Sequence, residues 1–333
     1  MRVLIVGGGS VGATFGYALH RAGVEVDYFV KRAHASECER GFRVFRIDRK
    51  GEQERFHARL VLTEWEDVAA AGPYDFVLVT VPADALRGEW FDQMVEAVEM
   101  ARIVLLQRGV GDDAWAEERA PRARIDRGLV GFLAYEAPLD GEASVRLGTA
   151  FWTPPLGKSF FESAEPHALS PLVAALERGG LPAAQAKGLE VKGVAGELLC
   201  MTLVMALEPV GYRIDELAGR RRLVSRAIAA TREAAEVLAT LHDIAPPALV
   251  RGLTPTAFVF GLKAARVVTP FSLEAYLRAH FTKVRAQMER NREMLLAEGR
   301  RLSIPTPALE ETHLFLGLRR PSVPVEAPSP PLA

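Results

Sequence analysis

The chain has 333 residues, of which 49% are hydrophobic and 25% are charged, a composition that excludes the disordered and fibrous classes. Its 41 basic and 42 acidic residues give a formal net charge of −1, so no overall field attracts nucleic acid or an anionic membrane. At roughly 100–200 residues per domain, this length predicts two domains.

The first half of the sequence alternates apolar strands with helical segments. Continuous apolar strands are typical of a sheet that is buried on both faces, so this half predicts an α/β fold with a Rossmann-type doubly wound sheet. We expect strands at Arg2–Val6, Val24–Val30, Asp75–Val81 and Arg102–Leu106, a helix at Val11–Ala22, further strands between Gly128 and Pro154, and an added hairpin of Phe42–Ile47 with Arg55–Leu62.

After Leu181 the pattern changes to helical periodicity. The glycine and proline cluster before residue 183 marks a boundary. We therefore expect a Rossmann-like domain over 1–182, an all-helical domain over 183–320 and a disordered proline-rich tail over 321–333. The expected helices are Glu190–Ala206, Arg221–His242, Ser272–Glu298 and Pro307–Leu318.

The run Gly7-Gly8-Gly9-Ser10-Val11-Gly12 fits the pattern G-x-G-x-x-G between a strand and a helix. In this pattern Gly7 permits the tight turn, Gly9 lets the backbone approach a pyrophosphate, and Gly12 lets the helix pack against the strand. The helix start, with Ser10 and Val11, would hold the phosphates. The alternative is a glycine-rich turn without a ligand.

The second expected strand ends in Lys31-Arg32, where NAD-binding proteins carry an acidic residue for the ribose 2′-hydroxyl. Two cations favour a 2′-phosphate, which a carboxylate would repel. The sequence therefore predicts NADPH or NADP⁺ as the cofactor. The alternative is that the two basic residues form a solvated strand end.

Together with these residues, the segments DFVLVTVPADAL, VLLQRGVG and GRRLSIPTP occur in an order that resembles the ketopantoate reductase (2-dehydropantoate 2-reductase) family over most of residues 1–318. The resemblance implies an NADPH-dependent 2-oxoacid reductase of the kind used in pantothenate biosynthesis, with a helical second domain. It also assigns Val81 and Pro82 to the cofactor site.

The resemblance places Lys192 at the position of the family's general acid. The segment VKGVAGELLCMTLVMAL is otherwise apolar, and burying an ammonium is costly, so this lysine should face a cleft. Partial burial would lower its pKa from about 10.4 and suit proton donation to a carbonyl oxygen. A lysine that extends to solvent from the first helical turn is the alternative, and Lys187 is the nearest other candidate.

Four single positions and one three-residue element depart from the family. Gly196 and Cys200 stand where asparagines are usual, Arg108 replaces an asparagine in a Gln-Asn-Gly turn, and Pro82 replaces a lysine. The family's Glu-Ile-Asp element falls on Gln287-Met288-Glu289. These substitutions leave open which 2-oxoacid is the substrate.

His280, Lys283 and Gln287 have the spacing i, i+3 and i+7, which places them on one face of a single helix. Such a face could hold a carboxylate by charge and a carbonyl by hydrogen bond, and Arg108 could add a bidentate contact from the other domain. The alternative is the solvated face of a long helix.

Cys38 and Cys200 have neither metal-ligand nor disulfide-framework spacing, which is typical of the reducing cytoplasm. No apolar run reaches the roughly 20 residues that cross a bilayer, so we expect no membrane partner, no nucleic-acid partner and a cytoplasmic location. The expected partner is a small-molecule 2-oxoacid, and an apolar helical domain is compatible with a homodimer. A non-catalytic NADP-binding regulator, and an oxidation running in the reverse direction, remain alternatives.

Overall fold

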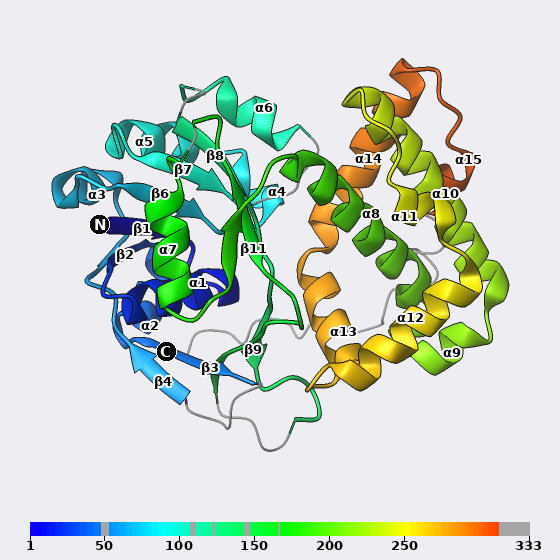
Figure 1. The fold of residues 1–333 in the computed structure, drawn as a ribbon, viewed down its shortest axis with the longest axis horizontal. Helices are drawn as coiled ribbons and strands as arrows, with labels where there is room; N and C mark the ends of the chain where they lie inside the picture. Colours follow the sequence, from blue (N-terminus) through cyan, green and yellow to red (C-terminus); the bar gives the residue numbers. More distant parts are fainter. Residues whose placement is uncertain (48–52, 107–110, 122–123, 143–146, 166, 313–333) are drawn as a thin grey trace, which may run out of the picture.

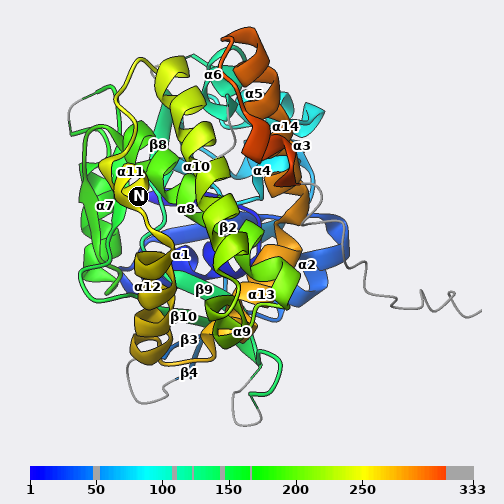
Figure 2. The same cartoon turned by 90° about the vertical axis from the view of Figure 1, so that its right-hand side faces the viewer.

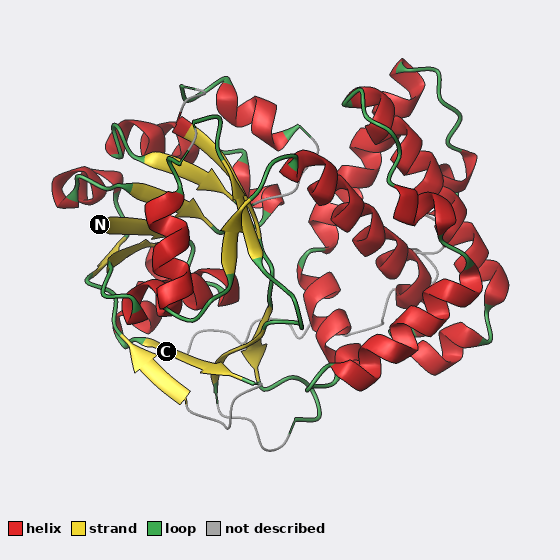
Figure 3. Cartoon of the chain, in the orientation of Figure 1, coloured by secondary structure: helices red, strands yellow, loops and turns green. Residues whose placement is uncertain are grey.

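The computed structural model describes residues 1–47, 53–106, 111–121, 124–142, 147–165 and 167–312. An α/β half and a helical half lie side by side (Figures 1 and 3), so the expected fold class is confirmed. The N-terminus lies at the outer edge of the α/β half in Figure 1. The first strand therefore runs toward the helical half, and the carboxyl ends of the strands parallel to it face the helices.

The main sheet has the strand order β12-β11-β8-β7-β6-β1-β2-β5. The strands from β8 to β5 are all parallel, whereas β11 is antiparallel to β8 and β12 is parallel to β11. The strands are β1 (Arg2–Val6), β2 (Glu25–Phe29), β5 (Leu60–Leu62), β6 (Phe76–Val79), β7 (Arg102–Leu105), β8 (Ile125–Leu129), β11 (Ser159–Glu162) and β12 (Ala183–Gln185).

A second, four-stranded sheet has the order β4-β3-β10-β9. Its β3 and β4 form the expected antiparallel hairpin. The expectation of one strand over Arg55–Leu62 is wrong, because β4 ends at Phe56 and Leu60–Leu62 crosses to the main sheet as β5, parallel to β2. The strands of the second sheet are β3 (Phe42–Arg46), β4 (Gln53–Phe56), β9 (Leu133–Ala137) and β10 (Gly148–Trp152).

Alternating residues of β1 supply two cores, one on each face of the main sheet. Val3 and Ile5 pack with α1 and α7, whereas Leu4 and Val6 pack with α3, α5 and α6. The helices of this half are α1 (Ser10–Arg21), α2 (Arg32–Glu39), α3 (Trp65–Ala71), α4 (Ala83–Leu86), α5 (Glu89–Ala97), α6 (Asp112–Glu117) and α7 (Ser170–Arg178).

The helical half is built around two long helices, α8 and α10, which pack along each other (Figure 2). Both helices were expected from the sequence and are confirmed, but the expected helix over Ser272–Glu298 is two helices that divide at Val284. The helices are α8 (Leu189–Leu207), η2 (Glu208–Val210), α9 (Ile214–Ala218), α10 (Arg221–Leu241), α11 (Ala248–Gly252), α12 (Pro255–Val268), α13 (Leu273–Lys283), α14 (Arg285–Arg301) and α15 (Pro307–Glu310).

Helix α8 is strongly apolar, with apolar residues on more than one side of the helix. The segment Lys192–Val210 is long and apolar enough to cross a membrane, with a mean hydropathy of 1.5, but 56% of it is buried within the protein. Tyr135 and Ala150, from the second sheet, extend the core to which α8 belongs. In this structure α8 is therefore the central helix of a packed core.

The main sheet extends past residue 182, because its last strand along the chain, β12, covers Ala183–Gln185. Strand β12 begins at Ala183 and still pairs with β11, and the first long helix of the second half starts at Leu189. The proline-rich tail over 321–333 lies outside the described residues.

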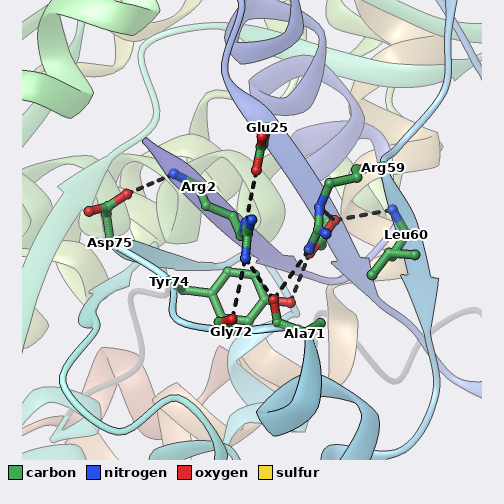
Figure 4. Close-up of polar contacts among 9 residues, drawn as sticks. Arg2, Glu25, Arg59, Leu60, Ala71, Gly72, Tyr74 and Asp75 are labelled. Carbon is green, nitrogen blue, oxygen red and sulfur yellow. Dashed lines mark hydrogen bonds and ion pairs between the residues drawn. The ribbon is translucent and has the colours of Figure 1, made fainter.

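A polar cluster joins β2, β5 and the loop before β6 near the amino ends of β5 and β6 (Figure 4). Asp27 is fully buried. Its carboxylate accepts hydrogen bonds from Arg59 Nε at 2.9 Å, from the Tyr74 hydroxyl at 2.8 Å and from the Leu60 N–H at 3.1 Å. This cluster holds the edge strand β5 to the sheet.

Candidate functional site

The glycine run forms a tight turn between β1 and α1. Gly7 has a φ of 111°, a conformation that L side chains rarely adopt. Its N–H donates to the Phe29 carbonyl at 3.0 Å, and Thr80 Oγ1 lies 3.0 Å from the carbonyl oxygens of Val6 and Gly7. The turn is therefore anchored to both neighbouring strands, β2 and β6.

The other two glycines of the pattern have opposite surroundings. A Cβ on Gly12 would lie 2.2 Å from the Gly7 carbonyl oxygen, whereas a Cβ on Gly9 would meet nothing within 4 Å. Gly9 is the N-cap of α1, and no side chain among the described residues caps this end, where Ser10 and Val11 open the helix. The open space in front of an uncapped helix start fits the pyrophosphate of a dinucleotide.

Replacing Gly9 by alanine is expected to weaken the binding of a nicotinamide dinucleotide about tenfold, or about 1.4 kcal/mol, because the new methyl group enters the open space. Isothermal titration with NADPH measures this. Gly261→Ala is the matched control, since its Cβ also meets nothing within 4 Å but lies on α12. Equal affinities in the two variants would contradict this role of Gly9.

The basic pair after β2 lies at the start of α2. Lys31 is the N-cap of α2, Arg32 is its first residue, and both are exposed. Arg32 Nη2 pairs with Glu64 Oε1 at 2.6 Å. Glu64 directly precedes α3 and follows β5, the neighbour of β2. This carboxylate was not expected from the sequence, because no local pattern indicates that β5 lies beside β2.

The segment after β6 connects the glycine turn to the helical half. Val81 lies against the turn, since a Cβ on Gly7 would come within 3.3 Å of its Cγ1, and Pro82 is the N-cap of α4. Gln287 Oε1 on α14 accepts from the Ala83 N–H at 3.4 Å. The structure therefore brings Gln287 to the carboxyl edge of β6.

A buried carboxylate makes a second connection to α14. Asp112 is 2% exposed, and its Oδ1 accepts from Arg87 Nε at 3.1 Å and from Arg290 Nη2 at 2.8 Å. It opens α6, shortly after residues 107–110. Arg108 falls in that stretch and lies outside the described residues.

His280, Lys283 and Gln287 do not lie on one continuous helix. His280 and Lys283 belong to α13, Gln287 belongs to α14, and Val284 between them has a ψ of 14°. The expectation that the three side chains share one face of a single helix is therefore wrong. Among the described hydrogen bonds of the three side chains, only that of Gln287 reaches the α/β half.

His280 as a whole residue is exposed, but its ring stacks on Tyr276 with ring centres 5.6 Å apart and meets Phe281 edge-on at 5.2 Å. Burial among these neighbours, and then the charge of Lys283, lower the pKa of His280. The lowered pKa favours the uncharged form of His280 near neutral pH, so among His280, Lys283 and Gln287 the positive charge comes from Lys283.

This lowered pKa predicts a pH dependence of stability. The unfolded chain, with a histidine pKa of about 6.5, binds more protons than the folded protein, so stability is lost as pH falls from there toward the folded pKa. We expect His280→Gln to make the urea midpoint modestly less sensitive to acidification, since the residue as a whole remains in contact with solvent. An unchanged pH dependence in the variant would refute this.

Helix α8 begins at a defined place on β11. Glu162 accepts from the N–H groups of Gly188 and Leu189, both at 2.8 Å, and so caps the helix start with a carboxylate. This contact sets the position of the first turn of α8, which carries Lys192.

Lys192 is exposed, so the partial burial expected from the sequence is wrong. Its Nζ lies 4.9 Å from the centre of the Phe160 ring, within the range of a cation–π contact. Phe160 pairs with Leu129, the last residue of β8, so this ammonium lies at the carboxyl edge of the sheet. Four strand spacings of about 4.8 Å separate β11 from β1. Lys192 lies beside β11 and the glycine turn follows β1, so the two are about 19 Å apart along the edge of the sheet.

A hydrogen-bonded pair that sequence analysis missed joins α8 to α14. Asn291 is 1% exposed and donates through Nδ2 to Glu197 Oε1, while its Oδ1 is buried without a hydrogen-bond partner among the described residues. Asn291 lies one turn after Gln287, and Glu197 lies five residues after Lys192. An asparagine four residues after Gln287 was the available sequence signal.

The two positions where the family usually has asparagines carry no comparable amide. Gly196 is exposed, and a Cβ there would meet nothing within 4 Å. Burial, and then Glu197, raise the pKa of the Cys200 thiol to about 11, so the thiol is neutral at physiological pH. Neither residue supplies charge to this region.

A small cavity of about 160 Å³ lies at the far end of α1, where Tyr17, Arg21 and Glu54 hydrogen-bond one another. Ligand pockets usually measure about 300–1,000 Å³, so this cavity is too small for a dinucleotide. The candidate cofactor site is the open cradle at the start of α1.

Comparison with known proteins supports the resemblance inferred from the sequence. Residues 3–153 match the family model described as ketopantoate reductase PanE/ApbA. No curated protein sequence matches the chain significantly.

Among solved structures, 2-dehydropantoate 2-reductase from Geobacter metallireducens GS-15 superposes with a TM-score of 0.70 at 18% identity, covering 95% of this chain and 99% of its own. A PanE/ApbA family ketopantoate reductase from Ralstonia eutropha JMP134 gives 0.68 at 20% identity, covering 96% and 98%. D-mandelate dehydrogenase, solved with NADH and anilino(oxo)acetate, gives 0.69 at 15% identity, covering 95% and 97%. At these identities the structures establish a shared fold.

Proposed function

Because residues 3–153 of this chain belong to the ketopantoate reductase PanE/ApbA family, we propose that the protein is an NADPH-dependent reductase that converts a 2-oxoacid into the 2-hydroxy acid. The observation that supports this most directly is the open cradle at Gly9 in front of the uncapped start of α1. When bound, the reduced nicotinamide supplies the hydride.

The cofactor would be held at two places. The N–H groups at Ser10 and Val11 would face the pyrophosphate, with Val81 and Pro82 flanking the turn. Lys31 and Arg32 would meet the 2′-phosphate, because both cations are exposed at the end of β2.

Lys192 would hold the proton at Nζ and deliver it to the substrate carbonyl oxygen. Its position at the carboxyl edge of β8 supports this role, since the substrate would lie between the two halves. The same group would accept the proton in the reverse direction, the oxidation of a 2-hydroxy acid with NADP⁺.

The substrate would be bound by groups from both halves. Arg108 would give its carboxylate a bidentate contact, and Lys283 would add a second positive charge. His280, uncharged at neutral pH, and Gln287 would donate hydrogen bonds. Ketopantoate belongs to this substrate class, and its reduction would place the protein in pantothenate biosynthesis.

The proposal also divides the chain into a cofactor domain over 1–182 and a helical domain over 183–320, in a cytoplasmic protein that could form a homodimer. Truncation at residue 182 would remove Lys192 and three of the four substrate-binding candidates. The cofactor domain alone should therefore show no reductase activity, even if it folds on its own.

The test is a titration of the purified protein with NADPH, followed by absorbance at the nicotinamide band while a panel of 2-oxoacids that includes ketopantoate is added. We expect NADPH to bind and one member of the panel to be reduced. Failure to bind any nicotinamide dinucleotide would overturn the proposal.

A second candidate function is a non-catalytic NADP-binding regulator. The observation that favours it is the absence of polar side chains at Gly196 and of charge at Cys200. Tight NADPH binding without turnover of any 2-oxoacid or 2-hydroxy acid in the panel would support this alternative.

A further inference from the structure

The ion pair between Arg32 and Glu64 lies where the cofactor's adenosine ribose would be recognised. Arg32 follows β2, Glu64 follows β5, and the two strands are hydrogen-bonded neighbours that end at the same edge. The atoms Nη2 and Oε1 are 2.6 Å apart. Any anion that approaches this guanidinium therefore meets a carboxylate already bound to it.

The residue after Glu64 is packed between aromatic neighbours in the fold. Trp65 stacks on Phe29 of β2 with ring centres 3.6 Å apart, and it also stacks on Trp90 with ring centres 6.2 Å apart. Thr63 Oγ1 lies 3.4 Å from Glu64 Oε1. The carboxylate is thus presented from a held position.

A carboxylate at this point has opposite effects on the two nicotinamide cofactors. A 2′-phosphate carries a charge of about −1.5 to −2 at pH 7 and would compete with Glu64 for the Arg32 fork, and the two anions would repel each other. A free ribose 2′-hydroxyl needs an acceptor, and carboxylates serve that purpose in NAD-binding proteins. Glu64 is a carboxylate at the strand edge where β2 itself ends in two cations.

We propose that Glu64 sets the choice between the phosphorylated and the unphosphorylated cofactor, by occupying Arg32 against a 2′-phosphate and by offering an acceptor to a 2′-hydroxyl. This inference rests on the proposed binding of a nicotinamide dinucleotide. It goes beyond that proposal because it assigns a selectivity role to a residue outside the glycine and basic motifs.

The experiment is calorimetric titration of the wild-type protein and Glu64→Gln with NADPH and with NADH, without substrate. We expect Glu64→Gln to bind NADPH at least fivefold more tightly and NADH more weakly, so that the ratio of the two dissociation constants shifts at least tenfold toward NADPH. The shift should shrink as ionic strength rises, because exposed charges are screened.

Glu66→Gln is the matched control, because it removes an exposed carboxylate two residues along from Glu64 that does not pair with Arg32. It should leave the ratio unchanged. Wild-type protein that binds neither cofactor would refute the proposed function. Wild-type protein that binds a cofactor, but whose ratio is unmoved by Glu64→Gln or moves equally in Glu66→Gln, would refute the role of Glu64 alone.

Discussion

Lys192→Ala is expected to lower kcat on the accepted 2-oxoacid by about 10²- to 10⁴-fold, the usual contribution of a positioned general acid. Its affinity for NADPH should stay at the wild-type value, because Lys192 is about 19 Å of sheet edge from the glycine turn. Steady-state kinetics and calorimetry on the same preparation separate the two effects.

Two further variants identify what is lost. Lys187→Ala removes an exposed lysine just before α8 and should retain wild-type kcat. Lys192→Arg keeps a cation near Phe160, but a guanidinium stays protonated near neutral pH and does not donate its proton, so this variant should stay slow. A loss in Lys187→Ala that equals or exceeds the loss in Lys192→Ala would mean that another group donates the proton.

The parts of the fold that local pattern determines could be predicted from the sequence. The strand before the glycine run, the helix after it and the long helices α8 and α10 appear where periodicity places them. The glycine turn was predictable in more detail, because each of its three glycines answers a separate steric demand.

What the sequence did not reveal depends on contacts between distant residues. The segment Arg55–Leu62 reads as one strand, but Arg59 and Leu60 bond to Asp27, more than thirty positions away, and this divides it between two sheets. In the same way, Glu64 gains its significance only through β5 lying beside β2.

The candidate substrate-binding region was least accessible to sequence reasoning. The division at Val284 leaves no mark in the apolar periodicity, so the relation of His280 to Gln287 could not be foreseen. The pair of Glu197 with Asn291 joins helices about ninety residues apart along the chain, and only tertiary packing brings them together.

Asp27→Ala is expected to destabilise the α/β half by about 3–5 kcal/mol, the usual cost of removing one partner from a buried ion pair. Asp27 is fully buried, and its loss would leave Arg59, the Tyr74 hydroxyl and the Leu60 N–H without their acceptor. Hydrogen bonding to Asp27 also raises the pKa of Arg59, as expected for a guanidinium held by a carboxylate. Urea unfolding followed by tryptophan fluorescence measures the loss, because all four tryptophans lie before residue 182.

The effect should extend from stability to cofactor binding. Asp27 holds β5, and β5 leads into Glu64 and Trp65 at the opposite end of the strand, so loosening it should weaken NADPH binding as well. Glu25 lies on β2, as Asp27 does, and forms an exposed ion pair with Arg2 of β1. Glu25→Ala breaks this pair and should leave both the stability and the NADPH affinity nearly unchanged. If Asp27→Ala unfolded at the same urea concentration as Glu25→Ala, β5 would have to be held by its backbone pairing to β2 alone, and the cluster in Figure 4 would carry no net stabilisation.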